Sequence, residues 1–246
     1  MKKITLLLTS LLCLSWSATQ EQVMNYLSLS KADRELIEIE QVFDNMRQNL
    51  DTEDNSSNEI NQRYSEYLQE HLSDNEMEEL IQLYQTPIMQ RFVTEMDLVD
   101  IPQEEMENFL LSLKEEPLEG ERQDIIDEIV KLTVKDEEVI NFYKSMTQRY
   151  GSRQKEKSPN TNKENNSTQY TPQEQQFLEG MKKGAKNALL YGTQVLGMEE
   201  MSELRQALKS SIISKASNVE SEAMIDVMDN FIQNIRSKPK ENNSTR

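Results

Sequence analysis

Residues 72–96 read LSDNEMEELIQLYQTPIMQRFVTEM, and this stretch indicates how the chain folds. Ser73 and Glu76 form a capping-box pattern, which marks the start of a helix. The apolar residues that follow recur three or four positions apart, as on one helix face: Met77, Leu80, Ile81 and Tyr84. Thr86-Pro87 then ends this helix and starts another, because proline suits the first position of a helix. The stretch therefore predicts two consecutive helices with a corner at residues 84–87.

The corner itself has a structural and a functional interpretation. We expect Tyr84 to end a buried stripe, and Arg91 to face solvent or pair with a carboxylate. The functional alternative makes both side chains ligand-binding groups. The structural interpretation is preferred, because aromatic residues at helical spacing are more often part of a core.

The rest of the sequence has the same helical pattern. Six glycines and six prolines are too few for the turns of an all-β fold, and Glu, Gln, Leu, Met and Lys are good helix formers. Apolar residues at helical spacing predict helices in these ranges: 30–50, 59–68, 102–113, 125–132, 139–150, 172–185, 204–212 and 217–235. The predicted fold class is all-α, a helical bundle or array.

A polar segment separates two helical parts in the predicted organisation. Residues 152–171 (SRQKEKSPNTNKENNSTQYT) contain no aliphatic side chain, so they cannot bury a core. We therefore expect an N-terminal helical domain at 19–151, a polar linker at 152–171 and a C-terminal helical part at 172–237. The tail at 238–246 is rich in polar and charged residues and is expected to be disordered.

The first eighteen residues have the pattern of a secretory signal peptide. Lys2 and Lys3 precede an apolar run over residues 4–16, and small residues follow at the expected cleavage site. A membrane anchor, the first alternative, needs about 20 apolar residues. Lipidation of Cys13 is the second, but Leu12 stands where a small residue is preferred. We expect residues 1–18 to be cleaved, which leaves a periplasmic or secreted protein with no transmembrane segment.

Composition excludes several classes of function. The chain has 44 acidic and 27 basic residues, a net charge of −17, which becomes −19 when the leader takes away two lysines and no acid. This charge repels phosphate backbones, so no nucleic-acid partner is expected. The leader also takes the only cysteine, which leaves no thiol chemistry or disulfides. His71 is the only imidazole, which excludes a histidine-rich metal site.

Clusters of acidic residues raise the possibilities of calcium binding and glycan hydrolysis. The closest match to a calcium loop starts at Asp51, but Ser56 replaces its glycine and Gln62 replaces its last glutamate. Paired carboxylates can hydrolyse glycans, but such sites usually have aromatic sugar platforms, and the mature chain has no Trp. Solvated helix faces explain these acids better. The residues considered, all acidic except Asn55, form four groups: Asp51, Glu53, Asn55 and Glu59; Glu76, Glu78 and Glu79; Glu104, Glu105 and Glu107; and Glu115, Glu116, Glu119 and Glu121.

One segment is rich in glycine and locally basic. It holds Gly180, Gly184, Gly192 and Gly197, together with Lys182, Lys183 and Lys186. Small residues on one helix face permit close helix contact. We expect tight packing inside the bundle; the alternative is a helix that docks a partner or touches lipid.

Residues 72–96 also resemble the signature of a known family. The signature has an acid, apolar residues, an aromatic-Tyr pair, Ser/Thr-Pro and a basic residue before further apolar ones. The residues that fit are Tyr84, Thr86, Pro87, Arg91 and Phe92. Leu83 replaces the usual aromatic, and Ile88-Met89 replaces the usual small residue and glycine. The segment is similar to the family called domain of unknown function 2059.

The resemblance extends over about residues 21–98, since VMNYLSLSKADRELIEIEQVFDNM (23–46) has the same rhythm. It implies an all-helical, exported bacterial protein. It implies no reaction, catalytic residue or cofactor, because the family has no agreed activity.

The sequence therefore predicts a non-enzymatic protein that binds or scaffolds an unknown protein partner in the cell envelope. No catalytic, cofactor-binding or metal-binding residue is assigned, and no cofactor is expected. Two alternatives stay open: a holdase-like periplasmic chaperone whose methionines contact unfolded segments, and a cell-wall glycan hydrolase with paired carboxylates.

Overall fold

The computed structural model describes residues 17–49, 59–97, 101–115, 118, 120–150 and 170–237. Within these ranges the chain forms eleven helices and no strand, which confirms the predicted all-α class. Residues 1–16 of the predicted leader, residues 152–169 of the predicted linker and the tail at 238–246 lie outside the described residues. In the described part, no helix is both long and apolar enough to cross a membrane.

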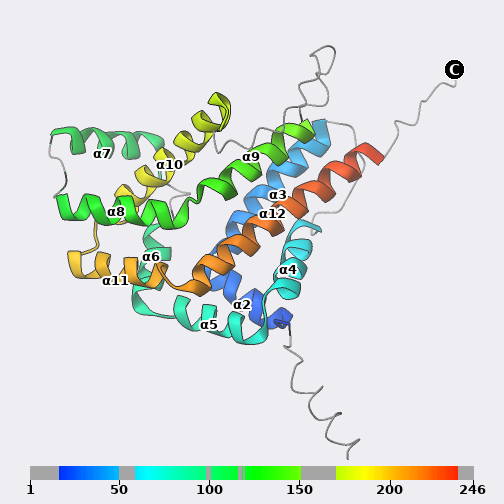
Figure 1. Ribbon diagram of the computed structural model, residues 1–246, viewed down its shortest axis with the longest axis horizontal. Coiled ribbons are helices and arrows are strands. Elements are labelled where there is room, and N and C mark those ends of the chain that lie inside the picture. The colour runs from blue at the N-terminus through cyan, green and yellow to red at the C-terminus, as the bar shows by residue number, and fades with distance from the viewer. Residues whose placement is uncertain are drawn as a thin grey trace, which may run out of the picture. The chain divides into compact units, whose positions relative to one another are not determined.

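Figure 1 labels the helices of the described chain in sequence order. They are α2 (Gln20–Ser30), α3 (Ala32–Asn49), α4 (Glu59–His71), α5 (Asp74–Tyr84), α6 (Pro87–Glu95), α7 (Gln103–Glu115), α8 (Gly120–Thr133), α9 (Asp136–Tyr150), α10 (Pro172–Gly192), α11 (Met198–Leu208) and α12 (Ser211–Ser237).

Contacts divide the described chain into two compact units, and the division falls within α6. Unit 1 consists of the described residues up to Gln90 and those from Ser211 onward; unit 2 is Arg91–Ser210. This grouping differs from the expected parts at 19–151 and 172–237. The last helix, α12, belongs with α2–α5, and α10 and α11 belong with α7–α9.

Unit 1 is held together by α12, which packs along α4 and also contacts α5. The rings of Phe43 in α3 and Phe231 in α12 stack with their centroids 4.1 Å apart. The buried stripe of α12 continues at helical spacing through most of its length: Ile212, Ala216, Val219, Ala223, Val227 and Phe231. Such a stripe must face a core, which explains why α12 joins the N-terminal helices.

The chain enters unit 1 through a pair of capped helices. The backbone N–H of Ala18 donates to the Leu72 carbonyl at 3.0 Å, and Ala18 is buried, although the sequence assigned it to the leader. Thr19 then caps α2, and Ser73 caps α5 through the predicted capping box with Glu76. These local bonds satisfy N–H groups that the helices leave free at their first turns.

The predicted corner is present between α5 and α6. Met77, Leu80 and Ile81 are buried as expected, but Tyr84 is only half-buried. The hydroxyl of Thr86 donates to the Leu83 carbonyl at 2.7 Å, so it closes the end of α5.

Unit 2 is organised around α8, which packs on both α10 and α11. Its apolar face is buried: Ile125, Ile126, Ile129 and Val130. Its acidic residues pair with the neighbouring helices, Asp127 with Lys186 of α10 at 2.6 Å and Glu128 with Lys209 of α11 at 2.6 Å. The opposite charges on facing helices add to the apolar contact, although exposed pairs of this kind contribute little individually.

Two predicted helix boundaries in the C-terminal region are wrong. The expected single helix through Leu208 and Ile212 is interrupted, because α11 ends at Leu208 and α12 begins at Ser211. The expected start of the last helix at Ser217 lies inside α12. A serine followed three residues later by Glu220 resembles a cap, but the buried stripe continues through it and the helix with it.

Candidate functional site

The loop of residues 193–197 connects α10 to α11 in unit 2 and is fixed on both sides. Thr193 is fully buried and Leu196 is 2% exposed, whereas the side chain of Val195 is 52% exposed. Gly192, the residue before the loop, has no room for a larger side chain. A Cβ atom there would lie 2.6 Å from Met96 Sδ and 2.9 Å from the Glu95 carbonyl oxygen. The loop thus begins at a close contact between two segments of unit 2.

Arg122 of α8 holds the loop from one side. Its Nη1 donates to the Leu196 carbonyl at 2.8 Å, and its Nη2 donates to the Thr193 carbonyl. Both acceptors belong to buried residues, where a carbonyl without a partner would be unfavourable. One planar guanidinium therefore satisfies two buried acceptors, which a lysine head could not reach in the same geometry.

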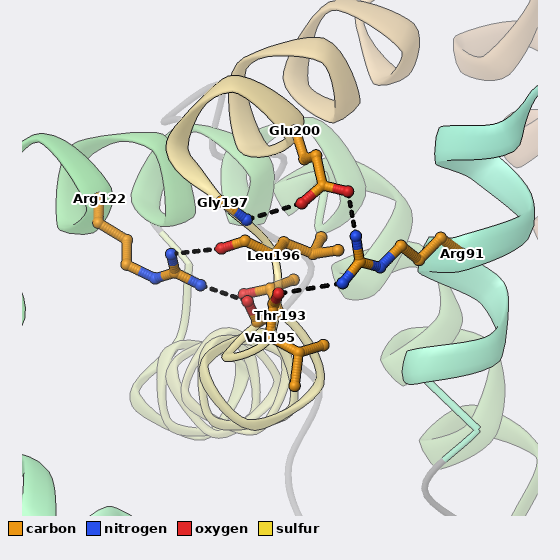
Figure 2. A network of polar contacts seen from close by, with 7 residues as sticks. All are labelled: Arg91, Arg122, Thr193, Val195, Leu196, Gly197 and Glu200. Carbon is orange, nitrogen blue, oxygen red and sulfur yellow. Dashed lines mark hydrogen bonds and ion pairs between the residues drawn. The ribbon is translucent and has the colours of Figure 1, made fainter.

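Arg91 of α6 holds the loop from the other side (Figure 2). Its Nη2 donates to the Val195 carbonyl at 3.1 Å, and its Nη1 pairs with the carboxylate of Glu200. The same carboxylate accepts the backbone N–H of Gly197 at 2.8 Å, where α11 begins. This N–H and the Arg91 guanidinium hold the pKa of the Glu200 carboxyl below its usual value.

We call Arg91, Arg122, Glu200 and the loop 193–197 the clamped loop. Arginine donors occupy the carbonyls of residues 193, 195 and 196, so the backbone is held at three successive points of the turn. The arrangement fixes backbone geometry and leaves one apolar side chain, that of Val195, outside. The loop therefore presents a fixed backbone turn and one apolar side chain to solvent.

Residues 58–107 match the family described as "Uncharacterized protein conserved in bacteria" (DUF2059). The match spans α4, α5, α6 and the start of α7, and it includes Arg91 of the clamped loop. It confirms the resemblance seen at residues 72–96, and it overlaps the expected extent of 21–98 from residue 58 onward. No curated protein and no solved structure matches the chain.

Two residues of the DUF2059 segment were candidates for ligand binding. Arg91 is paired with a carboxylate, as the structural interpretation expects. Tyr84 lies in unit 1, where its ring meets that of Tyr26 edge to face with centroids 5.4 Å apart. Gln90 donates to the Tyr84 carbonyl at 2.6 Å and to the Leu29 carbonyl at 3.3 Å, so it ties the corner to α2.

His71, the only imidazole of the chain, lies at the end of α4. Its ring stacks on that of Tyr67 with centroids 3.9 Å apart, and its Nδ1 donates to the Tyr67 carbonyl at 2.8 Å. The possible calcium loop covers residues 51–62, of which 51–58 lie outside the described residues and 59–62 belong to α4. Among the residues that the structure does describe, no group of three or more His, Cys, Asp or Glu side chains could hold a metal ion.

The glycine-rich segment divides into two kinds of position. Gly180 and Gly184 face open space on the exposed side of α10, so the expected tight packing is wrong for them. It is correct for Gly192. The nearby basic side chains take part in unit 2 packing, since Lys182 pairs with Asp136 and Lys186 with Asp127, each at 2.6 Å.

Five described carboxyls have a lowered pKa, and hydrogen bonds from lysine or backbone are the main cause. Lys215 lowers the pKa of Glu76, Lys186 that of Asp127 and Lys209 that of Glu128. The Thr171 and Gly197 backbone N–H groups lower the pKa of Glu174 and Glu200. A general acid in glycan hydrolysis needs a raised pKa, so these five carboxyls have the opposite shift.

Sequence reasoning missed Arg122, Val195 and Glu200. Glu200 had a local signal, because it stands three residues after Gly197 in a cap-like pattern. Arg122 had none, since its acceptors are more than 70 residues away in the chain.

Proposed function

We propose that this chain is an exported bacterial protein that acts by binding another protein of the cell envelope, without catalysing a reaction. The observation that carries the proposal is the clamped loop. Two arginines from α6 and α8 fix its backbone, Thr193 and Leu196 are buried, and Val195 alone among its apolar side chains faces solvent. The match of residues 58–107 to a bacterial family is consistent with this setting.

A fixed loop is well suited to binding. A partner that contacts Val195 does not have to order the loop, so more of the contact energy contributes to affinity. A few residues contribute most of the energy of an interface, and the contacts around them exclude water. Gln194 and Glu199, which are exposed on either side, provide polar groups for such contacts.

Export is the second element of the proposal. Ser15 and Ser17 are the small residues expected three positions and one position before a signal-peptidase cut, so we propose a cut before Ala18, one residue earlier than the predicted leader of residues 1–18. The Ala18 N–H donates to the Leu72 carbonyl, and Thr19 caps α2, so the residues directly after the proposed cut belong to the fold.

Mass spectrometry of the protein recovered from cells is expected to give a mature chain that begins at Ala18. A chain that retains Met1, or one that carries a lipid on Cys13, would contradict this prediction.

The binding surface is tested by Val195→Glu, with Gln194→Glu as the matched control that adds the same charge one residue away. Both side chains are exposed, so neither substitution should change the melting temperature measurably. We expect a photo-crosslinker placed at residue 195 in living cells to capture a discrete partner protein. With that partner purified, Val195→Glu should weaken binding about tenfold, and Gln194→Glu much less.

Equal affinities of wild type and Val195→Glu for the captured protein would show that the clamped loop is not the contact surface. Absence of any crosslinked protein from position 195 would contradict the proposal directly.

A holdase function is the second candidate, because large apolar side chains are exposed on both units: Met24, Ile37, Val42, Leu111, Met181 and Val195. Such a chaperone would suppress the aggregation of a chemically denatured client at near-stoichiometric amounts. Because its contacts would be spread over many residues, Val195→Glu alone would leave that suppression nearly unchanged.

A further inference from the structure

Helix α7 is the least covered helix in the described part of the chain. Between Gln103 and Lys114 none of its side chains is buried, whereas each of the other ten described helices buries at least one. The helix is nevertheless rich in large apolar residues. Leu111 is 54% exposed. Four other apolar residues, three or four positions apart as on a buried helix face, are only half-buried: Met106, Phe109, Leu110 and Leu113.

What attaches α7 to unit 2 is a small contact with the end of α10. The ring of Phe109 meets that of Tyr191 edge to face with centroids 5.2 Å apart, and the Tyr191 hydroxyl donates to Glu105 at 2.5 Å. A helix of 13 residues is marginal in water on its own, and most helical stability in proteins comes from burial of an apolar face. Helix α7 therefore has apolar surface left over for a further contact.

The sequence around α7 is strongly acidic. Between Glu95 and Glu121 the sequence has ten acidic residues and one basic residue, Lys114. On α7 itself, Glu104 and Glu107 are exposed and stand seven and four positions before Leu111, on the same side of the helix. The exposed leucine therefore lies beside two carboxylates.

We propose that α7 is a docking surface for a basic amphipathic helix of a partner protein. The apolar face of that helix packs on Leu110, Leu111 and the half-buried residues beside them. Its lysine or arginine side chains pair with Glu104 and Glu107. Apolar helix-on-helix contact with a charged margin is a common mode of peptide recognition, and complementary charge selects the partner and speeds its association.

Charge decides between this occupant and two others. A second copy of the chain would bring a net charge of −17 to an already acidic surface. A membrane with anionic headgroups would be repelled for the same reason. A basic helix relieves the repulsion among these carboxylates while it covers the apolar side chains.

This surface is additional to the clamped loop, and the inference shares with the proposed function only the premise that the protein binds other proteins. The two are tested by different residues, so one can fail while the other holds.

The test uses the mature protein and a synthetic peptide of leucine and lysine with helical amphipathic spacing, about five turns long, roughly 18 residues. Two control peptides accompany it: one with glutamate in place of lysine, and one with the same composition in scrambled order. We expect the amphipathic basic peptide to bind, and each control to bind at least about tenfold more weakly. Hydrogen exchange of the α7 amides should slow on binding, while that of α11 is unchanged.

Variants of exposed residues locate the site without disturbing the fold. Leu111→Gln and the double substitution Glu104→Lys/Glu107→Lys should each weaken the peptide about tenfold. Glu203→Lys, an exposed reversal on α11, is the matched control and should have little effect. Melting temperatures of all three variants should equal that of the wild type. Raised salt should weaken binding to the wild type more than to the double variant.

Several results would overturn the proposal. One is that the basic peptide does not bind, and another is that the glutamate or scrambled peptide binds equally well. A third is that Glu203→Lys reduces the affinity for the basic peptide as much as the α7 variants do, which would indicate attraction to net charge alone. A dimer in sedimentation that Leu111→Gln dissociates would assign α7 to a second copy. Binding to vesicles of anionic lipid that Leu111→Gln abolishes would assign it to a membrane. Val195→Glu should leave peptide binding intact; its effect on partner capture bears only on the clamped loop.

Discussion

Replacement of Tyr26 by alanine is expected to lower the free energy of unfolding of unit 1 by about 3–5 kcal/mol, the usual range for loss of a large buried aromatic. Tyr26 is 1% exposed and lies on α2, where its ring meets that of Tyr84 edge to face. Its hydroxyl donates to Glu220 of α12 at 2.7 Å. One side chain thus joins α2, α5 and α12, so its removal leaves a cavity among three helices.

Tyr26→Phe is the matched control, because it keeps the ring and removes only the hydroxyl. Burial raises the pKa of the Tyr26 phenol well above its usual value, and the Glu220 carboxylate raises it further, so the phenol is a neutral donor at pH 7. Loss of its bond to a carboxylate should lower the free energy of unfolding by about 1–2 kcal/mol.

Hydrogen exchange of the α2 and α12 amides as a function of urea measures unit 1 separately from unit 2. A loss below about 1 kcal/mol for Tyr26→Ala would contradict the burial described for this ring. An equal loss for alanine and phenylalanine would show that the hydroxyl, and not the packing of the ring, supplies the stability.

The sequence located most helices because their signals are local. The capping box at Ser73 involves residues three positions apart and forms as expected, and a second box of the same kind forms at Thr171. Helix α2 was missed, and the helix expected from residue 30 begins at Ala32, after Lys31 adopts a positive φ of 60° that glycine or asparagine usually supplies. A lysine in the sequence gives no signal that its backbone adopts a positive φ.

The pairing of helices could not be read from local patterns. Arg63 of α4 bonds Asp226 of α12, which is 163 positions away in the chain. Apolar spacing showed that both helices have a buried face, but not which faces meet. Tyr84 illustrates the same limit: its place on the stripe was correct, yet the fully buried aromatic at that point of the core is Tyr26.

The clamped loop was recognised only at Arg91. That residue stood out because it fits a family pattern, and pairing with a carboxylate was expected of it. Its partner Glu200 is 109 positions away, so the pair becomes visible only in the fold. Arg122 is one of many charged residues on amphipathic helices, and only the structure shows that it reaches backbone carbonyls.

The second large effect is expected from Arg122→Met, which should lower the free energy of unfolding of unit 2 by about 1–3 kcal/mol. Methionine keeps much of the apolar length of the side chain and removes both donors. The Leu196 carbonyl then loses its donor in a buried setting, which costs about 1–3 kcal/mol. The Thr193 carbonyl keeps one donor, the Leu196 N–H at 3.0 Å, so it loses only its second hydrogen bond.

Arg91→Met is the matched control in the same loop. Its partners are more accessible, because Val195 is exposed and the Arg91–Glu200 pair is partly exposed, so water can replace the lost bonds. A loss of less than about 1 kcal/mol is expected, as for other surface ion pairs. Arg122→Lys should fall between the two methionine variants, since one ammonium cannot match the fork that reaches both carbonyls.

Exchange of the α8 and α11 amides in urea measures these differences, and exchange of the loop amides shows how far the backbone opens. In Arg122→Met the loop amides should exchange faster, although the Val195 side chain is still present. Binding of the crosslinked partner should then weaken, because the partner must order the loop on contact. If Arg91→Met destabilised unit 2 as much as Arg122→Met, burial of the two carbonyls would not be what fixes the loop. Arg122→Met could also loosen the loop without changing the partner's affinity. That result would show that the rigidity of the loop has no role in binding, even if the Val195 side chain contacts the partner.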